Sequence, residues 1–242
     1  MGTGTVTPRY AIYLTPGIGG GDPVAIELRD LVDRWLGRSL LTETVEQQSL
    51  LDWPRAEIDR ITTEPRRYGF HATLKAPFHL RDEYSAADLE QATRRLAARC
   101  DPIHIPSLRL KNIAGFLALV PGKELPDLHE LANECVTELD TFRAPLTEPE
   151  RARRTLSALS TRQLEYLERY GYPYVLEEFT PHFTLTNKLP ATRLPVVESG
   201  LQALLGRLTD VEMRVDHLSL VEEPAPGAPF RIHSLHPLKG TQ

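Results

Sequence analysis

A series of elements recurs in the same order in the two halves of this chain, at a nearly constant offset of 105 to 111 residues. Each half is expected to contain a strand that ends in Pro-Gly, an amphipathic helix, a second strand, a further helix and a closing strand. In the first half these lie at about residues 9–14, 23–37, 71–74, 85–99 and 108–110, and in the second at about 115–120, 126–139, 182–185, 194–208 and 218–220. A repeat of this kind predicts a duplicated lobe.

The second strand of each half carries the same short motif. His71-Ala72-Thr73-Leu74 recurs 111 residues later, from position 71 to 182, as His182-Phe183-Thr184-Leu185. Side chains two positions apart on a strand share a face, so each motif presents one imidazole beside one hydroxyl. Two such strands facing each other would form a pocket of the size of a phosphate group.

A third match to the loose pattern, His217-Leu218-Ser219-Leu220, does not fit the repeat. In the register of the two halves His217 falls opposite Ser107, which has no imidazole, whereas His71 and His182 fall opposite each other. The repeat therefore selects His71 and His182 as the candidate pair.

Paired His-x-Thr-Leu strands in a duplicated α+β chain resemble the two-histidine (2H, LigT-like) phosphoesterase superfamily. Further blocks resemble the branch of that superfamily known as phosphonate-metabolism proteins: Arg9 to Tyr13, Tyr68 to Phe78, Phe142 to Leu146, Gly171 to Tyr174 and Pro181 to Thr186. These blocks span nearly the whole chain. The name of the branch refers to an operon context and specifies no reaction.

The fold class we predict is α+β, with two lobes related by a pseudo-twofold axis and a central cleft between them. Each lobe is expected to be an antiparallel sheet with helices on its outer side, formed by one repeat at about 8–112 and the other at about 113–238 within a single bilobal domain. The stretch 144–174 has no counterpart in the first half. We expect it to lie over the cleft as a specificity element or lid.

The resemblance and the motifs give the candidate residues. Hydrolysis of a phosphodiester needs a group that takes a proton from water and another that protonates the leaving oxygen, and His71 and His182 supply both, because imidazole titrates near neutrality. Thr73 and Thr184 would donate hydrogen bonds to the phosphate oxygens. On regular strands Lys75 and Thr186 would share the faces of these threonines. Arg143 in a loop and Tyr172 complete the expected substrate-binding residues.

Composition restricts the partners. The chain has 28 Lys and Arg residues against 33 Asp and Glu, a formal net charge of −5, so we expect a small phosphorylated substrate and no long nucleic acid. The two cysteines form no Cys-x-x-Cys motif, and the other histidines form no metal-binding motif, so neither cofactor nor metal is predicted. With no apolar run long enough for a membrane span and no signal pattern, we expect a cytoplasmic monomer.

The sequence thus favours a metal-independent cyclic phosphodiesterase that acts on a 2′,3′-cyclic nucleotide or on a cyclic phosphate of a phosphorylated sugar. Two alternatives stay open. The same chemistry could serve RNA end ligation or 2′-5′ phosphodiester cleavage, or the chain could bind nucleotides or phosphonates without catalysis. The acidic composition argues against long RNA, and the intact histidines and threonines argue against a binding protein without activity.

Overall fold

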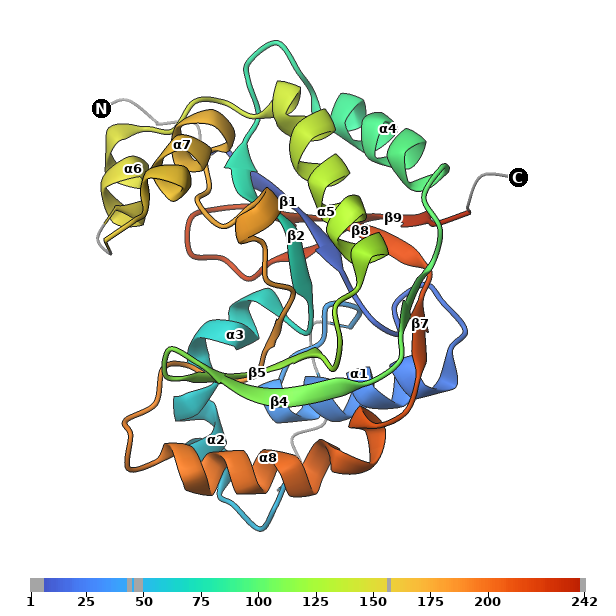
Figure 1. Ribbon diagram of the computed structural model, residues 1–242, viewed down its shortest axis with the longest axis vertical. Coiled ribbons are helices and arrows are strands. Elements are labelled where there is room, and N and C mark those ends of the chain that lie inside the picture. The colour runs from blue at the N-terminus through green and yellow to red at the C-terminus, as the bar shows by residue number, and fades with distance from the viewer. Residues whose placement is uncertain (1–6, 43–44, 46–49, 156–157, 240–242) are drawn as a thin grey trace.

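The computed structural model describes residues 7–42, 45, 50–155 and 158–239, which adopt the predicted α+β fold (Figure 1). Within this part of the chain the strands form three antiparallel sheets, in the orders β2-β1-β8-β9, β4-β5-β6 and β3-β7. The strands are β1 (Arg9–Leu14), β2 (Ala72–His79), β3 (Ile103–Ile105), β4 (Leu108–Ile113), β5 (Phe116–Pro121), β6 (Phe183–Thr184), β7 (Met213–Val215), β8 (His217–Glu223) and β9 (Arg231–Pro237).

Two pairs of helices pack against the larger sheets. Helices α4 and α5 lie against the sheet that contains β2, β8 and β9, whereas α1 and α8 lie together beneath the sheet of β4 and β5 (Figure 1). The long helices are α1 (Pro23–Leu36), α4 (Ala86–Ala97), α5 (Pro126–Glu138), α7 (Thr161–Tyr170) and α8 (Leu194–Thr209). The shorter ones are α2 (Arg55–Ile61), α3 (Thr63–Tyr68), α6 (Glu148–Arg154) and the 3-10 turns η1 (Leu139–Phe142) and η2 (Leu176–Glu178).

The helix ends follow local sequence signals. Ser85 accepts a hydrogen bond from the Asp88 N–H, and the Asp88 carboxylate accepts one from the Ser85 N–H, so α4 begins with a capping box. Helix α7 begins in the same way at Ser160. No helix in the described part of the chain is both long and apolar enough to span a membrane.

The closing strand of each half completes the sheet of the other half. Strand β4, from the first half, pairs with β5, while β8, from the second half, pairs with β1. Each of the two larger sheets therefore has a central strand, β1 or β5, that is flanked by the motif strand of its own half and the closing strand of the other. The two sheets do not correspond to contiguous halves of the chain, and the duplication itself stays a prediction.

Strand β1 is buried on both faces, and this places one of its side chains at the site. Ile12 and Leu14 belong to the main hydrophobic core beneath the helices. Tyr13 points to the opposite face, as the alternation of a strand requires, and packs with Phe230. That face is the one on which Thr73 of β2 lies, because Thr73 is the register partner of Tyr13.

Candidate active site

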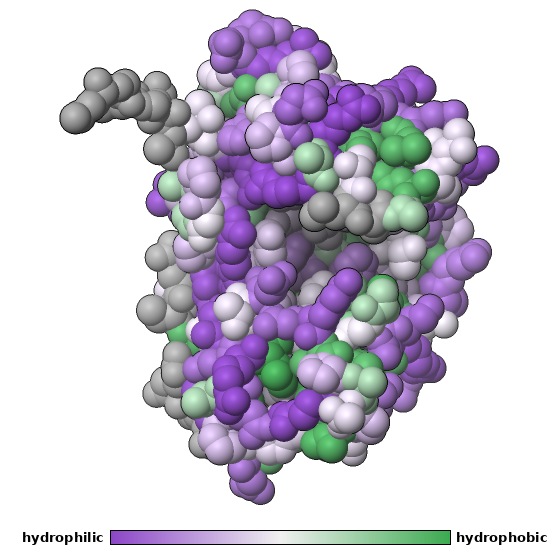
Figure 2. Space-filling view, turned by 90° about the vertical axis from the view of Figure 1, so that its left-hand side faces the viewer, coloured by the Kyte–Doolittle hydropathy of each residue, from purple (hydrophilic) through white to green (hydrophobic). Residues whose placement is uncertain are grey.

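A cleft between the two larger sheets contains both motifs. It consists of two adjoining cavities of about 660 and 560 Å³, which share Thr73, Phe116 and Tyr172 in their walls. The larger cavity is lined by His71 and Thr184, and the other by His182. Figure 2 shows this face of the molecule hollowed between its upper and lower parts, with mostly hydrophilic residues around the hollow.

His71 is held in one tautomer by the backbone. Its Nδ1 lies 2.9 Å from the carbonyl oxygen of Gly69, two residues earlier. A carbonyl oxygen only accepts hydrogen bonds, so Nδ1 carries the proton and Nε2 of the neutral ring has a free lone pair. The fixed backbone contact orients Nε2 toward Thr73, whose Oγ1 lies 3.1 Å away.

His182 makes the same kind of contact in the second motif. Its Nδ1 lies 2.7 Å from the carbonyl oxygen of Thr180, again two residues earlier. The same reasoning gives a protonated Nδ1 and a free Nε2. Both histidines thus have the tautomer that makes Nε2 a proton acceptor while the ring is neutral.

Gly69 supports the His71 contact through its backbone conformation. Its φ of 72° with ψ of −173° belongs to a region that essentially only glycine adopts. A Cβ at this position would also lie 2.6 Å from Cγ of Leu40. The glycine therefore allows α3 to end directly before the motif strand with its carbonyl oxygen aimed at the imidazole.

The surroundings of His71 disfavour its charged form. Its ring stacks on Tyr13 with a centroid distance of 3.8 Å and lies 5.9 Å from the ring of Tyr68. Burial lowers the pKa of His71 to about 4; the Gly69 carbonyl opposes this change, and His182 adds to it by repulsion between like charges. His71 is therefore neutral at pH 7.

The two motif threonines lie on β2 and β6, and each of these strands pairs with the central strand of its sheet. Thr73 pairs with Tyr13 of β1 and lines both cavities, and Thr184 pairs with Ala118 of β5 and lines the larger one. The sequence motifs thus bring two imidazoles and two hydroxyl groups to one cleft.

The expectation that Lys75 shares the face of Thr73 is wrong, because β2 is bulged. Tyr13 pairs with Thr73 and the preceding Ile12 pairs with Lys75, so two steps on β2 correspond to one step on β1. The extra residue turns Lys75 to the core side. There its Nζ donates to the Val136 carbonyl oxygen at 3.0 Å and to Oδ1 of Asp140 at 3.1 Å. Lys75 is 3% exposed, and burial lowers its pKa.

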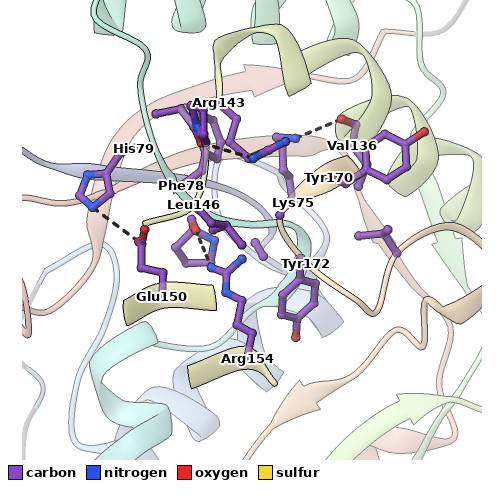
Figure 3. A pocket seen from close by; sticks show the side chains of 16 residues that line it. Lys75, Phe78, His79, Val136, Arg143, Leu146, Glu150, Arg154, Tyr170 and Tyr172 are labelled. Atoms are coloured by element: carbon purple, nitrogen blue, oxygen red, sulfur yellow. Dashed lines mark hydrogen bonds and ion pairs between the residues drawn. The ribbon is translucent and has the colours of Figure 1, made fainter. Parts of the chain in front are cut away.

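The sequence predicts Arg143 as a substrate-binding residue, but Arg143 does not line either cavity of the cleft. Its guanidinium forms a bidentate ion pair with Asp140, at 2.8 and 3.0 Å, and donates to the Arg169 carbonyl oxygen at the end of α7. Figure 3 shows Arg143 and Lys75 at a small cavity of about 20 Å³, which adjoins the larger cleft cavity because both are lined by Pro77, Arg154 and Tyr172. Together the two cations connect β2, α5, η1 and α7, and neither of them lines the two cavities of the cleft.

The other two predicted binding residues do line the cleft. Tyr172 is part of the wall of both cavities, and burial raises the pKa of its phenol. Thr186 lines the larger cavity, but it is 1% exposed and its Oγ1 accepts a hydrogen bond from the Leu117 N–H at 2.9 Å. This contact gives Thr186 a structural task in joining β5 to the segment after β6.

Sequence reasoning gave too little weight to three cleft residues. Arg154 ends α6 and lines the larger cavity, although Arg151 and Arg153 of the same helix are exposed to solvent. Tyr13 and Tyr68 flank the ring of His71. The alternation of β1 could have identified Tyr13 once its pairing with β2 was known, but the sequence has no signal for that pairing.

The third histidine match lies elsewhere. Nδ1 of His217 is 3.0 Å from Oδ1 of Asp216, and His217 does not line either cavity of the cleft. Among the described residues, no group of three or more His, Cys, Asp or Glu side chains is arranged to hold a metal ion.

Comparison with protein families places the chain. A family model described as "Protein of unknown function (DUF1045)" matches residues 73–231, which is well over half of the chain. The chain belongs to this family. Two curated relatives, both named "Ribose 1,5-bisphosphate phosphokinase PhnN", are 37% identical over 227 residues in Janthinobacterium sp. (strain Marseille) and 36% identical over 226 residues in Laribacter hongkongensis (strain HLHK9).

These alignments cover 92% and 93% of this DUF1045 chain but only 49% and 50% of the relatives. The chain therefore spans about half the length of the curated relatives it matches. Similar solved structures include E. coli LigT complexed with 3′-AMP, at 16% identity and a TM-score of 0.46 over 98% of this chain and 100% of that one. The Thermus thermophilus protein TT0787 has 18% identity and a TM-score of 0.46 over 97% and 100%. These scores are low, so the assignment of the site rests on its own geometry.

Proposed function

We propose that this DUF1045 chain is a metal-independent phosphodiesterase that opens a cyclic phosphodiester of a ribose by two-histidine acid–base catalysis. The observation that carries the proposal is the equivalent setting of His71 and His182. Each donates from Nδ1 to the carbonyl oxygen two residues before it and lines a shared cleft beside a threonine of its own motif. Two proton-transfer groups and two hydroxyl donors are what in-line hydrolysis of a phosphodiester needs.

The two histidines take different roles. His71 is neutral at pH 7 because burial lowers its pKa to about 4, so it is the general base that takes a proton from the attacking water. An anionic phosphodiester bound beside the ring raises that pKa and makes the base stronger. His182 acts as the general acid in its charged form, in which Nδ1 stays bonded to the Thr180 carbonyl oxygen and Nε2 carries a second proton. Nε2 gives this proton to the leaving alkoxide oxygen. After each turnover His71 releases the proton taken from water and His182 takes one up again from solvent.

Thr73 couples to the protonation of His71. Nε2 of the neutral ring is an acceptor, so the Thr73 hydroxyl donates its hydrogen to it across the 3.1 Å contact. The attacking water needs the same single lone pair, so it displaces the Thr73 hydroxyl as it gives its proton to Nε2, and the Thr73 hydrogen is then free to turn toward a non-bridging phosphate oxygen. The second donor to these oxygens is Thr184. The hydroxyl donation thus becomes available as charge develops on the phosphorane.

The relatives' name supports a sugar phosphate as the substrate. It contains ribose 1,5-bisphosphate, and this chain corresponds to about half of each relative. If the substrate is a 1,2-cyclic phosphate of ribose 5-phosphate, cleavage of the bond to O2 gives a ribose bisphosphate as product. We infer that this class of compound is preferred over a 2′,3′-cyclic nucleotide.

The test is incubation of EDTA-treated protein with both classes of cyclic phosphodiester, with phosphomonoester formation as the readout. We expect turnover without added metal, and loss of turnover in His71→Ala and in His182→Ala. His217→Ala, which removes an imidazole outside the cleft, serves as the matched control and should keep full activity. Near wild-type turnover in either motif variant, or activity that returns only with zinc or manganese, would refute the mechanism.

A further inference from the structure

The larger cavity has an excess of positive charge at some distance from the motif. Among the described residues its charged lining consists of three cations, Arg9, Arg154 and Lys188, and one carboxylate, Glu64. Arg9 already has an ion-pair partner, because its guanidinium lies 2.5 Å from Glu223, a carboxylate that also pairs with Arg67. Lys188 is exposed to solvent. Arg154, at the end of α6, is the third cation.

Arg154 is part-buried, and among the described residues no carboxylate lies within ion-pair distance of it. The carboxylate that acts on it from further away is Glu150, one turn earlier on α6. Its Nη2 donates to the Pro77 carbonyl oxygen at 3.4 Å, a weak contact, and its guanidinium carbon lies 5.7 Å from the ring centroid of Tyr172. Figure 3 shows its side chain beside Tyr172, in the wall of the small cavity that Arg143 also lines. Burial lowers the pKa of Arg154, but a guanidinium stays charged at neutral pH. A buried cation of this kind is stabilised by an anion.

The position of Arg154 separates it from the reacting phosphate. Thr73 and Pro77 are four residues apart on β2, about 13 Å in a regular strand and less where the strand is bulged. Arg154 contacts Pro77, whereas His71 and Thr73 line the same cavity from the start of β2. A substrate that spans the cavity therefore presents one group to the histidines and a different group to Arg154.

We propose that Arg154 binds a second anionic group of the substrate, a terminal phosphate remote from the cyclic phosphodiester. A guanidinium offers five N–H donors in a planar fork that fits phosphate oxygens, and only one of them contacts Pro77. Tyr172 supports the fork by lying against its face. The proposal rests on the phosphodiesterase function above and deepens it, because it specifies a sugar that carries phosphate at both ends.

Binding of ribose 5-phosphate tests the site without any turnover. We expect the full chain to bind ribose 5-phosphate but not ribose in isothermal titration calorimetry, and Arg154→Gln to weaken binding about 10- to 100-fold, the effect of losing a charge-assisted hydrogen bond. Arg154→Lys should retain part of the affinity. Arg153→Gln, which removes the neighbouring exposed arginine, is the matched control and should bind as the wild type does. Equal affinities of the wild type and Arg154→Gln overturn the proposal, as does a wild type that binds ribose equally well.

Turnover separates this inference from the proposed function. The wild type should prefer a cyclic phosphodiester with a terminal phosphate over the same compound without it, and Arg154→Gln should reduce this ratio of kcat/KM about 10- to 100-fold, mainly through KM. Turnover with no such preference overturns the inference and leaves the phosphodiesterase standing. Absence of turnover on every cyclic phosphodiester, with ribose 5-phosphate binding still dependent on Arg154, refutes the function and supports the anion site.

Discussion

Lowering the pH is expected to destabilise the folded protein through His71. Its ring is stacked on Tyr13 at 3.8 Å, and burial there outweighs the favourable Gly69 carbonyl, so the pKa in the folded state is about 4. In the unfolded chain a histidine titrates at about 6.5. A difference of about 2.5 pKa units corresponds to about 3 kcal/mol of stability, at about 1.4 kcal/mol per unit.

The direction follows from which state binds the proton. At a pH above about 6.5 both states hold a neutral His71, and the full stability is present. Between about 6.5 and 4 the unfolded chain binds a proton that the folded protein does not, so stability falls as the pH falls. Below about 4 the loss is complete. Between about pH 7 and pH 5 the expected loss from this one group is about 2 kcal/mol.

Urea unfolding of the wild type and of His71→Asn at these two pH values measures the effect. Asparagine keeps an N–H donor for the Gly69 carbonyl oxygen and does not titrate, so other groups cancel in the comparison. The wild type should lose about 2 kcal/mol more than His71→Asn. His104→Asn, at an exposed position, controls for the loss of an imidazole as such. The reasoning fails if the wild type and His71→Asn lose the same stability.

Two further predictions concern the threonines and the core lysine. Thr73→Val and Thr184→Val should each lower kcat about 10- to 1,000-fold with smaller changes in KM, because each removes one donor to the phosphorane. The control Thr137→Val, at an exposed site on α5, should leave kcat unchanged. Unchanged kcat in both motif variants would mean that Thr73 and Thr184 have only a structural role. Lys75→Met should leave kcat/KM within about threefold but lower the free energy of unfolding by about 1 to 3 kcal/mol, because the ammonium binds Val136 and Asp140 outside the cleft. Urea unfolding measures the loss of stability, with Lys123→Met at an exposed position as the control. A large rise in KM in Lys75→Met would contradict this prediction and indicate that Lys75 binds substrate.

The sequence alone was sufficient to predict strands and helices of the repeat and to select the motif pair. Period-2 and period-3.6 patterns located β1 and α1 within a residue or two, because local hydrophobic patterning and end signals such as Pro23 act over a few residues. The repeat selected His71 and His182 over His217, and the structure places His71 and His182 at one cleft and His217 outside it.

Which cations face the cleft depends on contacts between distant segments of the chain. A bulge in β2, visible only in its pairing with β1, reversed the side of Lys75, and the register of a strand depends on its neighbour and not on its own residues. Asp140 binds both Lys75 and Arg143. Lys75 and Asp140 are 65 residues apart in the chain, so no local sequence pattern encodes their contact. Arg154 occupies the cavity instead, while its neighbour Arg153 faces solvent.

For His71 too, some properties follow from the local sequence and others depend on tertiary packing. Its sequence position predicted an imidazole beside a hydroxyl, since this follows from the geometry of a single strand. Its tautomer, its low pKa and hence its role as base depend on the Gly69 carbonyl and on Tyr13 from another strand. Desolvation is a property of everything packed around a group, so it exists only once distant segments have come together.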